Sequence, residues 1–151
     1  MLVAPQSHPL ARQAQVGFAE VIEHPMVAFY EGSTLTKFLD SRVEATGRPL
    51  LRPRVQVNSF EALCLMVEAG VGLAIAPESA ARRHAGSMRI AVVPLSDPWA
   101  VRERYLVTRG LDHAPSTLRD LVVVIRAHHG TFREPEVANA VGARAHTLRL
   151  W

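Results

Sequence analysis

The chain has 151 residues, 48% of them hydrophobic, with a mean hydropathy of +0.08 and a formal net charge of +3. This apolar content and low net charge exclude a disordered chain, and the length suits one globular domain or one domain with a partial second unit. The basic residues are spread along the chain, which argues against a nucleic-acid-binding patch.

The N-terminal segment and the cysteine content bear on the cellular compartment. Residues 1–9 lack the basic start and long apolar segment of a signal peptide, so we expect no leader. The immediate start on the apolar segment Leu2–Ala4 indicates a truncated chain. Cys64 is the single cysteine and allows no intrachain disulfide, and no apolar run approaches the roughly 20 residues of a membrane span. We therefore expect a cytoplasmic protein without a membrane segment.

Predicted strands and helices alternate through much of the chain. Apolar or alternating runs predict strands at 2–4, 25–30, 53–58, 71–76, 90–93 and 105–108. Helical spacing of apolar residues predicts helices at 17–23, from 33 to about 46, from 58 or 59 to 70, at 77–83 and from 116 to about 127. Alternation over residues 25–93 predicts βαβ units, and hence an α/β fold with a mainly parallel sheet flanked by helices.

Helix-terminal residues refine these boundaries. Ser33 and Ser116 are expected N-caps, and Asn58 has the spacing of a capping box with Glu61, with Asn in place of Ser or Thr. Pro77 is expected at the first position of its helix.

The segment Ala69–Pro77, AGVGLAIAP, resembles a phosphate-binding glycine loop at first sight. A dinucleotide fingerprint needs a third glycine and lies between a strand and a following helix. Here position 75 is isoleucine, and Gly70 and Gly72 follow a helix and precede a strand. We interpret Gly70 as the residue that ends the helix, and Gly72 as the point where the chain turns into the sheet.

Catalytic and metal-binding patterns are weak. The seven histidines show no His-x-x-x-His spacing, and no Gly-x-Ser-x-Gly motif is present. Thr34 and Lys37 only faintly resemble a Ser-x-x-Lys pair. We therefore expect no catalytic residues, no metal site and no cofactor.

Polar residues that follow strands are the remaining candidates for a site. The segments Tyr30–Thr34 and Val57–Ser59 each place hydroxyl groups and free backbone N–H groups at the carboxyl end of a predicted strand. In open α/β sheets, ligands bind outside these ends, and helix N-termini attract anions. A small polar or anionic ligand is expected here, although plain helix capping explains each segment alone, and Glu31 opposes a strongly anionic ligand.

Several segments together resemble the effector-binding domain of the bacterial LysR-type transcriptional regulators. They are LVAPQSHPLA, HPMVAFYEGSTLTKFLD, VQVNSFEALCLMVEAGVGLAIAPESAARR, VVPLSDPWAVRERYLVTR and APSTLRDLVVVI, within residues 1–127. The most specific part is the stretch from Asn58 to Pro77.

The resemblance implies a fold like that of type 2 periplasmic binding proteins, with an effector between two α/β subdomains. It assigns residues 18–100 to subdomain two, and residues 1–11 and 102–127 to the crossover strands and one helix of an incomplete subdomain one. Residues 128–151 have no counterpart and are expected to be a poorly ordered tail. The family's DNA-binding helix-turn-helix has no counterpart in this chain, so DNA is expected as a partner only through a domain outside it.

Carried over residue by residue, the resemblance implies an effector site at Tyr30, Glu31, Gly32, Ser33, Thr34, Asn58, Ser59 and Pro77. The implied function is non-catalytic: an effector changes how homodimers or tetramers of the full-length regulator hold DNA. A fragment of a periplasmic-type solute-binding protein and a small α/β enzyme remain as alternatives. Because Leu2–Ala4 lacks its neighbouring subdomain, we also expect exposed apolar surface and a weakly stable or self-associating chain.

Overall fold

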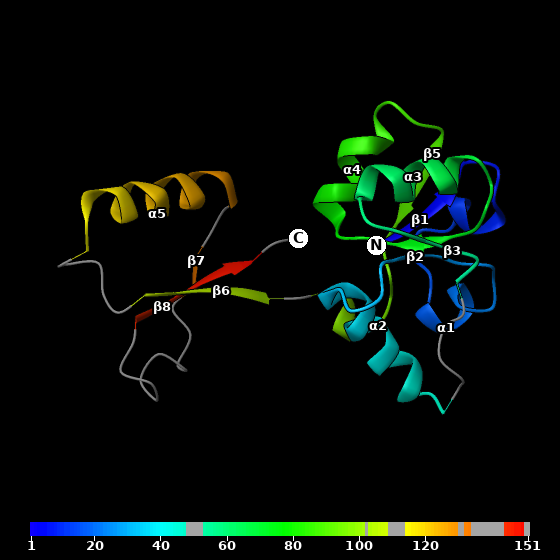
Figure 1. Cartoon of the computed structure of the whole chain (residues 1–151), viewed down its shortest axis with the longest axis horizontal. Helices are drawn as coiled ribbons and strands as arrows, with labels where there is room; N and C mark the ends of the chain where they lie inside the picture. Colours follow the sequence, from blue (N-terminus) through cyan, green and yellow to red (C-terminus); the bar gives the residue numbers. More distant parts are fainter. Residues whose placement is uncertain (48–52, 102, 109–113, 130–131, 134–143, 150–151) are drawn as a thin grey trace. The chain divides into compact units, whose positions relative to one another are not determined.

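A computed structural model describes residues 1–47, 53–101, 103–108, 114–129, 132–133 and 144–149. The chain divides into two compact units, Met1–Ala100 and Val101–Trp151 (Figure 1). The first contains β1 (Leu2–Pro5), η1 (Pro9–Arg12), α1 (Phe18–Val21), β2 (Val27–Phe29), α2 (Thr34–Glu44), β3 (Val55–Val57), α3 (Phe60–Glu68), β4 (Ala74–Ile75), α4 (Glu78–Ala85), β5 (Ile90–Val93) and η2 (Pro98–Ala100). The second contains β6 (Glu103–Thr108), α5 (Ser116–His129), β7 (Phe132–Arg133) and β8 (Arg144–Arg149).

The strands of the first unit form a mixed sheet in the order β3-β2-β4-β1-β5. β2 pairs with β3 in parallel, and β1 pairs antiparallel with both β4 and β5. A parallel bridge between Met26 and Leu73 joins the two groups, with hydrogen bonds from Val27 N to Leu73 O (2.7 Å) and from Leu73 N to Pro25 O (2.8 Å). Four strands therefore run in one direction, as predicted, and β1 alone runs against them.

The prediction that Leu2–Ala4 lacks neighbours and exposes apolar surface is wrong. Leu2, Val3 and Ala4 are fully buried, and β1 has a hydrogen-bonded strand on each side. Residues 1–11 therefore belong to the same compact unit as residues 18–100. The burial arises because alternate side chains of a central strand enter different layers of the core.

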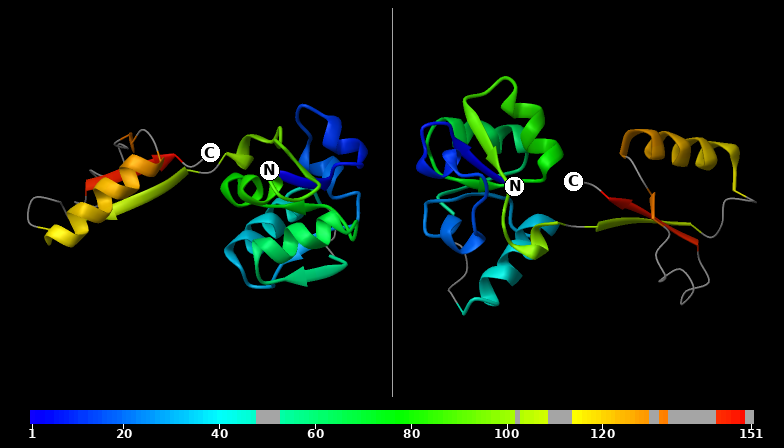
Figure 2. Two further views of the ribbon diagram at one scale, coloured as in Figure 1. Left: turned by 90° about the horizontal axis from the view of Figure 1, so that it is seen from above. Right: turned by 180° about the vertical axis from the view of Figure 1, so that it is seen from behind.

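Helices cover both faces of this sheet (Figure 2), and the buried apolar residues form two clusters. Leu2 and Ala4 pack in the cluster that contains Leu39 and Val43 of α2. Val3 packs in the other cluster, which contains Leu63, Cys64 and Val67 of α3 and Ala81 of α4. Cys64 is a buried free thiol, and burial raises its pKa.

The two glycines of the AGVGLAIAP segment have the structural roles that the sequence indicated. Gly70 ends α3 with a φ of +76°, the left-handed conformation that favours glycine at a helix C-terminus. Gly72 lies against the neighbouring strand, so that an added Cβ would lie 2.5 Å from Pro25 O. Both residues shape the scaffold, and neither forms a phosphate loop.

The segment before the unit boundary is held by polar and aromatic contacts. Asp97 Oδ2 accepts a hydrogen bond of 2.7 Å from Phe18 N at the start of α1. Trp99 makes edge contacts with Phe18 and Phe38, and the Arg42 guanidinium lies over the Phe38 ring, 4.8 Å from its centroid. These contacts tie η2 to α1 and α2.

The second unit combines α5 with a three-stranded antiparallel sheet in the order β6-β8-β7. Within residues 128–151, expected to be a poorly ordered tail, the structure describes the end of α5 at His129, β7 and β8, and β8 pairs with β6 along its whole length. The other residues of this segment lie outside the described ones, and the poor order of the tail stays a prediction. Leu118 N and Arg119 N donate to Pro115 O, so Pro115 rather than Ser116 has the N-cap position of α5. Several exposed apolar side chains lie on α5, where the exposed fractions of Leu121 and Val123 are 53% and 63%. Self-association stays a prediction and rests on α5 instead of β1.

Acidification is expected to weaken the fold through His8. His8 Nδ1 accepts a hydrogen bond of 3.2 Å from Leu10 N, and the His8 and His24 rings lie 4.9 Å apart. Burial, and secondly His24, lower the pKa of His8 from its usual value of 6.5. The unfolded chain therefore binds a proton more readily, so the free energy of unfolding falls as the pH drops through 6.5 and levels off below the folded pKa.

Urea unfolding at about pH 7.5 and about pH 5.5 measures this effect. The variant His8→Asn keeps an acceptor for Leu10 N but does not titrate, so its stability is expected to fall less over the same interval. An equal fall in both proteins would show that His8 is not responsible.

Candidate functional site

The parallel pairing of β2 with β3, and the parallel bridge between Met26 and Leu73, place the carboxyl ends of β2, β3 and β4 at one edge of the first unit's sheet. Phe29 pairs with Val57, so Tyr30 and Asn58 are level with each other, each one residue beyond its strand. Extending the Met26–Leu73 bridge in parallel register brings Pro77 to the same level. Helices α2, α3 and α4 start from these three points, so the edge combines three helix N-termini.

A tight turn shapes the first of these connections. Ser33 N donates to Tyr30 O at 3.2 Å, and Gly32 has a φ of +88°. A positive φ at the third position of a β-turn favours glycine, which explains Gly32. The turn leaves Tyr30, Glu31 and Thr34 exposed and places Ser33 at the start of α2.

Ser33 is buried, with 7% of its surface exposed, and its hydroxyl group is fully engaged within the protein. Its Oγ accepts from Thr36 N at 3.1 Å and donates to Thr36 Oγ1 at 2.9 Å, and Thr36 Oγ1 donates to Phe29 O at 2.9 Å. The Ser33 side chain therefore holds the end of β2 against α2. By helix geometry, the N–H groups of Thr34 and Leu35 have no intrahelical acceptor and remain as donors for a ligand.

The replacement Ser33→Ala is expected to destabilise the fold more than Ser59→Ala. Both remove an N-cap, but only Ser33 is buried and part of a longer hydrogen-bond chain. We expect a loss of about 1–2 kcal/mol for Ser33 and about 0.5–1 kcal/mol for Ser59. Urea unfolding compares the two, and an equal loss would contradict the structural role given to the Thr36 contact.

In the second connection, the residue that caps the helix lies one position after the predicted one. Ser59, with extended backbone angles, is the N-cap of α3, and its Oγ accepts from Ala62 N at 3.1 Å. Asn58 is exposed and precedes the cap, so its predicted pairing with Glu61 as a capping box is wrong. Glu61 lies in the first turn of α3, where the helix dipole favours an acidic residue.

An aromatic row joins the first two connections. The Phe29 ring stacks on the Phe60 ring at 4.6 Å with an interplanar angle of 25°, and the Tyr30 ring lies 5.3 Å from Phe29. Phe29 and Phe60 are partly buried, whereas the exposed fraction of Tyr30 is 48%. Tyr30 is therefore the outermost ring of the row and the one most open to a ligand.

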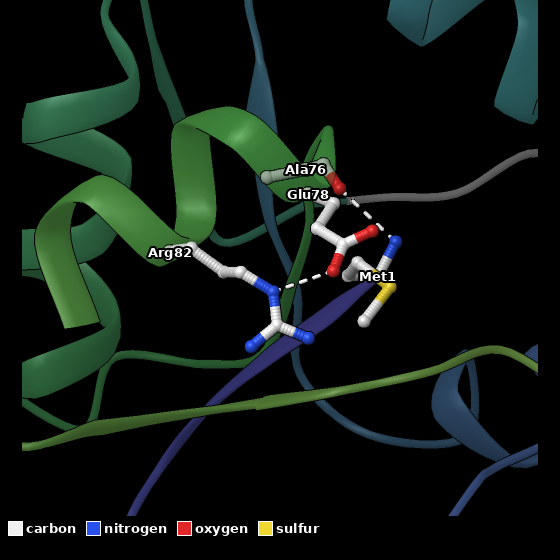
Figure 3. Close-up of polar contacts among 4 residues, drawn as sticks. All are labelled: Met1, Ala76, Glu78 and Arg82. Carbon is white, nitrogen blue, oxygen red and sulfur yellow. Dashed lines mark hydrogen bonds and ion pairs between the residues drawn. The ribbon is translucent and has the colours of Figure 1, made fainter. Parts of the chain in front are cut away.

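The third connection surrounds Pro77, which precedes α4 as its N-cap. The Met1 amine donates to Ala76 O at 3.0 Å (Figure 3). Burial lowers the pKa of this amine, against the opposing effect of Glu78. Glu78 is paired with Arg82 four residues later, which offsets its charge at this edge. Pro77 itself is half-buried and contributes no side-chain donor.

The charges around the edge are mixed. Burial, followed by Glu44 and then Glu31, raises the pKa of Asp40 in α2, so Glu31 adds negative potential on this side. Among the described residues, no group of three or more His, Cys, Asp or Glu side chains is placed to hold a metal ion. No described helix is long and apolar enough to cross a membrane.

Comparison with known families gives this arrangement its context. The sequence model of the LysR substrate binding domain matches residues 1–130, which is most of the chain. The chain belongs to this family. Its α/β architecture and its match to this family confirm the type 2 periplasmic-binding-protein-like fold that the sequence resemblance implied.

A curated relative and several solved structures are similar to this LysR-family chain. It is 33% identical over 109 residues to an uncharacterised HTH-type transcriptional regulator of Escherichia coli K12, YnfL, and the match covers 71% of this chain and 36% of YnfL. The BenM effector-binding domain with benzoate is 19% identical, with a TM-score of 0.66 over 90% of this chain and 62% of BenM's. The QuiR effector-binding domain in complex with shikimate is 21% identical, with a TM-score of 0.52 over 64% of this chain and 44% of QuiR's. The chain thus spans about a third of the curated relative.

The structure adds residues to the edge that the sequence pattern did not identify. Thr36 links Ser33 to Phe29, and its position three residues after a serine cap is the signal that could have found it. Phe60 directly follows the Ser59 cap, yet its stacking on Phe29 depends on the parallel pairing of β2 with β3. Local sequence carries no information on that pairing.

Proposed function

We propose that this chain is the effector-binding part of a LysR-type transcriptional regulator. The observation that carries the proposal is the convergence of three strand-to-helix connections at one sheet edge, in a chain that belongs to this family. Ligands of open α/β sheets bind outside the carboxyl ends of parallel strands. Tyr30, Glu31, Gly32, Ser33, Thr34, Asn58, Ser59 and Pro77 form the proposed binding surface.

The geometry favours a small polar or anionic effector. The first turns of α2 and α3 present backbone N–H groups and positive dipole ends toward the same edge. Ser33 and Ser59 act mainly by holding these turns, since their hydroxyl groups are engaged as caps. Glu31 favours an effector with a single, localised negative charge over a highly charged one.

The proposed role is binding without chemical conversion. An effector that binds one arrangement of the full-length regulator more tightly than another shifts the population toward that arrangement. The size of this shift is limited by the difference between the effector's affinities for the two arrangements. In this proposal the full-length protein is a cytoplasmic homodimer or tetramer, and it contacts DNA through a domain outside this chain. Membership of the LysR family disfavours the alternative of a periplasmic solute-binding protein.

A thermal-shift screen of small carboxylic acids against the 151-residue chain tests the proposal. A ligand that binds the folded state raises Tm in a concentration-dependent way. Ser59→Asp keeps an N-cap acceptor but adds a negative charge at the edge, so it is expected to reduce the shift that an acid produces. Ser87→Asp, at an exposed position after α4, is the matched control and is expected to leave the shift unchanged. Failure of every acid to raise Tm, or equal shifts in both variants, would contradict the proposal.

A further inference from the structure

Tyr30 is a large aromatic residue that is half exposed and yet fixed in place. Its exposed fraction is 48%, and it directly follows β2 at the edge where the proposed effector binds. Tyr30 O accepts the hydrogen bond from Ser33 N that closes the turn, and the positive φ of Gly32 fixes the path of that turn. The backbone of Tyr30 is therefore held from both sides, by β2 and by the turn.

The Tyr30 ring is also supported from within the protein. It contacts Phe29 at a centroid distance of 5.3 Å and an interplanar angle of 42°, and Phe29 in turn stacks on Phe60. Phe60 lies in the first turn of α3, and Phe29 O accepts from Thr36 Oγ1 of α2. Two helices and a strand thus support the inner part of this row, while its outer ring stays open.

We propose that Tyr30 makes the site selective for effectors that carry a planar aromatic ring, in preference to saturated rings of the same charge. The inference rests on the proposed function and names the chemical class of its ligand, an aromatic acid. A flat aromatic ring that makes offset or edge contacts with another aromatic ring gains binding free energy in addition to that from buried apolar area. A saturated ring gains only the part that comes from buried apolar area.

Two features of the structure favour an aromatic acid as the ligand. The Tyr30 ring loses little conformational freedom on binding because Phe29 and the turn already restrict it, which lowers the cost of association. The row also ends beside the first turns of α2 and α3, so an acidic group on the ring would lie near their free N–H groups.

Titration of the 151-residue chain with benzoate and with cyclohexanecarboxylate tests the inference, with the amide resonances of Ser33 and Asn58 followed by NMR. The two probes share their charge and differ in the planarity of the ring. The unmodified chain is expected to bind benzoate about three- to tenfold more tightly. Tyr30→Phe keeps the ring and the preference, whereas Tyr30→Leu keeps apolar bulk and loses the preference.

The outcomes separate this inference from the proposed function. Equal binding of both acids by the unmodified chain, or a benzoate preference that persists in Tyr30→Leu, would overturn the role of Tyr30 and leave an effector site in place. Binding of neither acid, together with a Tm rise from a non-aromatic acid, would likewise overturn the ring preference alone. If no acid binds, both proposals fail. Because Tyr30 is half exposed, its variants are expected to fold, and their amide spectra in the absence of ligand report this directly.

Discussion

Replacing Gly72 by alanine is expected to lower the free energy of unfolding by about 3 kcal/mol or more. A Cβ at this position would lie 2.5 Å from Pro25 O and 2.9 Å from Pro25 C, and both are backbone atoms that cannot rotate away. Relief requires β4 to separate from β2, which lengthens the hydrogen bonds between Val27 and Leu73 and between Leu73 and Pro25. Urea unfolding measures the loss.

Gly86→Ala is the matched control for this substitution. Gly86 follows α4 with a φ of −71°, and a Cβ there would meet no atom within 4 Å. The control is expected to change stability by less than about 1 kcal/mol, in the stabilising direction. Similar losses in both variants would contradict the close approach of β4 to β2.

Shortening Leu2 to alanine is expected to cost about 3 kcal/mol, within the usual range for a fully buried leucine. Leu2 has no exposed surface and packs among residues of η1, α1 and α2, with a strand on each side. The change leaves a cavity at the centre of the sheet, where neighbouring strands cannot close around it.

Leu65→Ala provides the comparison for Leu2. Leu65 lies on α3 with 44% of its surface exposed, so its truncation is expected to cost less than about 1 kcal/mol. Equal losses at the two positions in urea unfolding would contradict the burial of Leu2 and would agree with the apolar exposure that the sequence predicted for Leu2–Ala4.

Much of the fold could be predicted from patterns of residues that are close together in the sequence. The cap at Ser33, the end of α3 at Gly70 and the alternation of strands with helices all depend on residues close together in the chain. The position of β1 could not be predicted in this way, because Leu2–Pro5 pairs with residues about 70 to 90 positions away. The same reason applies to β8, whose antiparallel partner β6 lies about 40 residues earlier.

In the candidate site, too, some features could be predicted from local sequence and others could not. The polar residues after β2 and β3 could be identified from the sequence because helix caps have a recognisable pattern. Whether Asn58 or Ser59 caps α3 depended on backbone angles, and the structure has Ser59 in this role. The aromatic row from Tyr30 to Phe60 required the parallel register of β2 with β3, which brings Phe29 and Phe60, 31 positions apart, into contact.

We expect effectors to bind at the sheet edge formed by the ends of β2, β3 and β4. Mapping of amide chemical-shift changes in the 151-residue chain, on addition of an acid that raises its Tm, tests this most directly. We predict that the largest changes lie at residues 30–35, 58–61 and 77–79. Changes concentrated on α5, or at the opposite edge of the sheet near His8 and His24, would contradict the account.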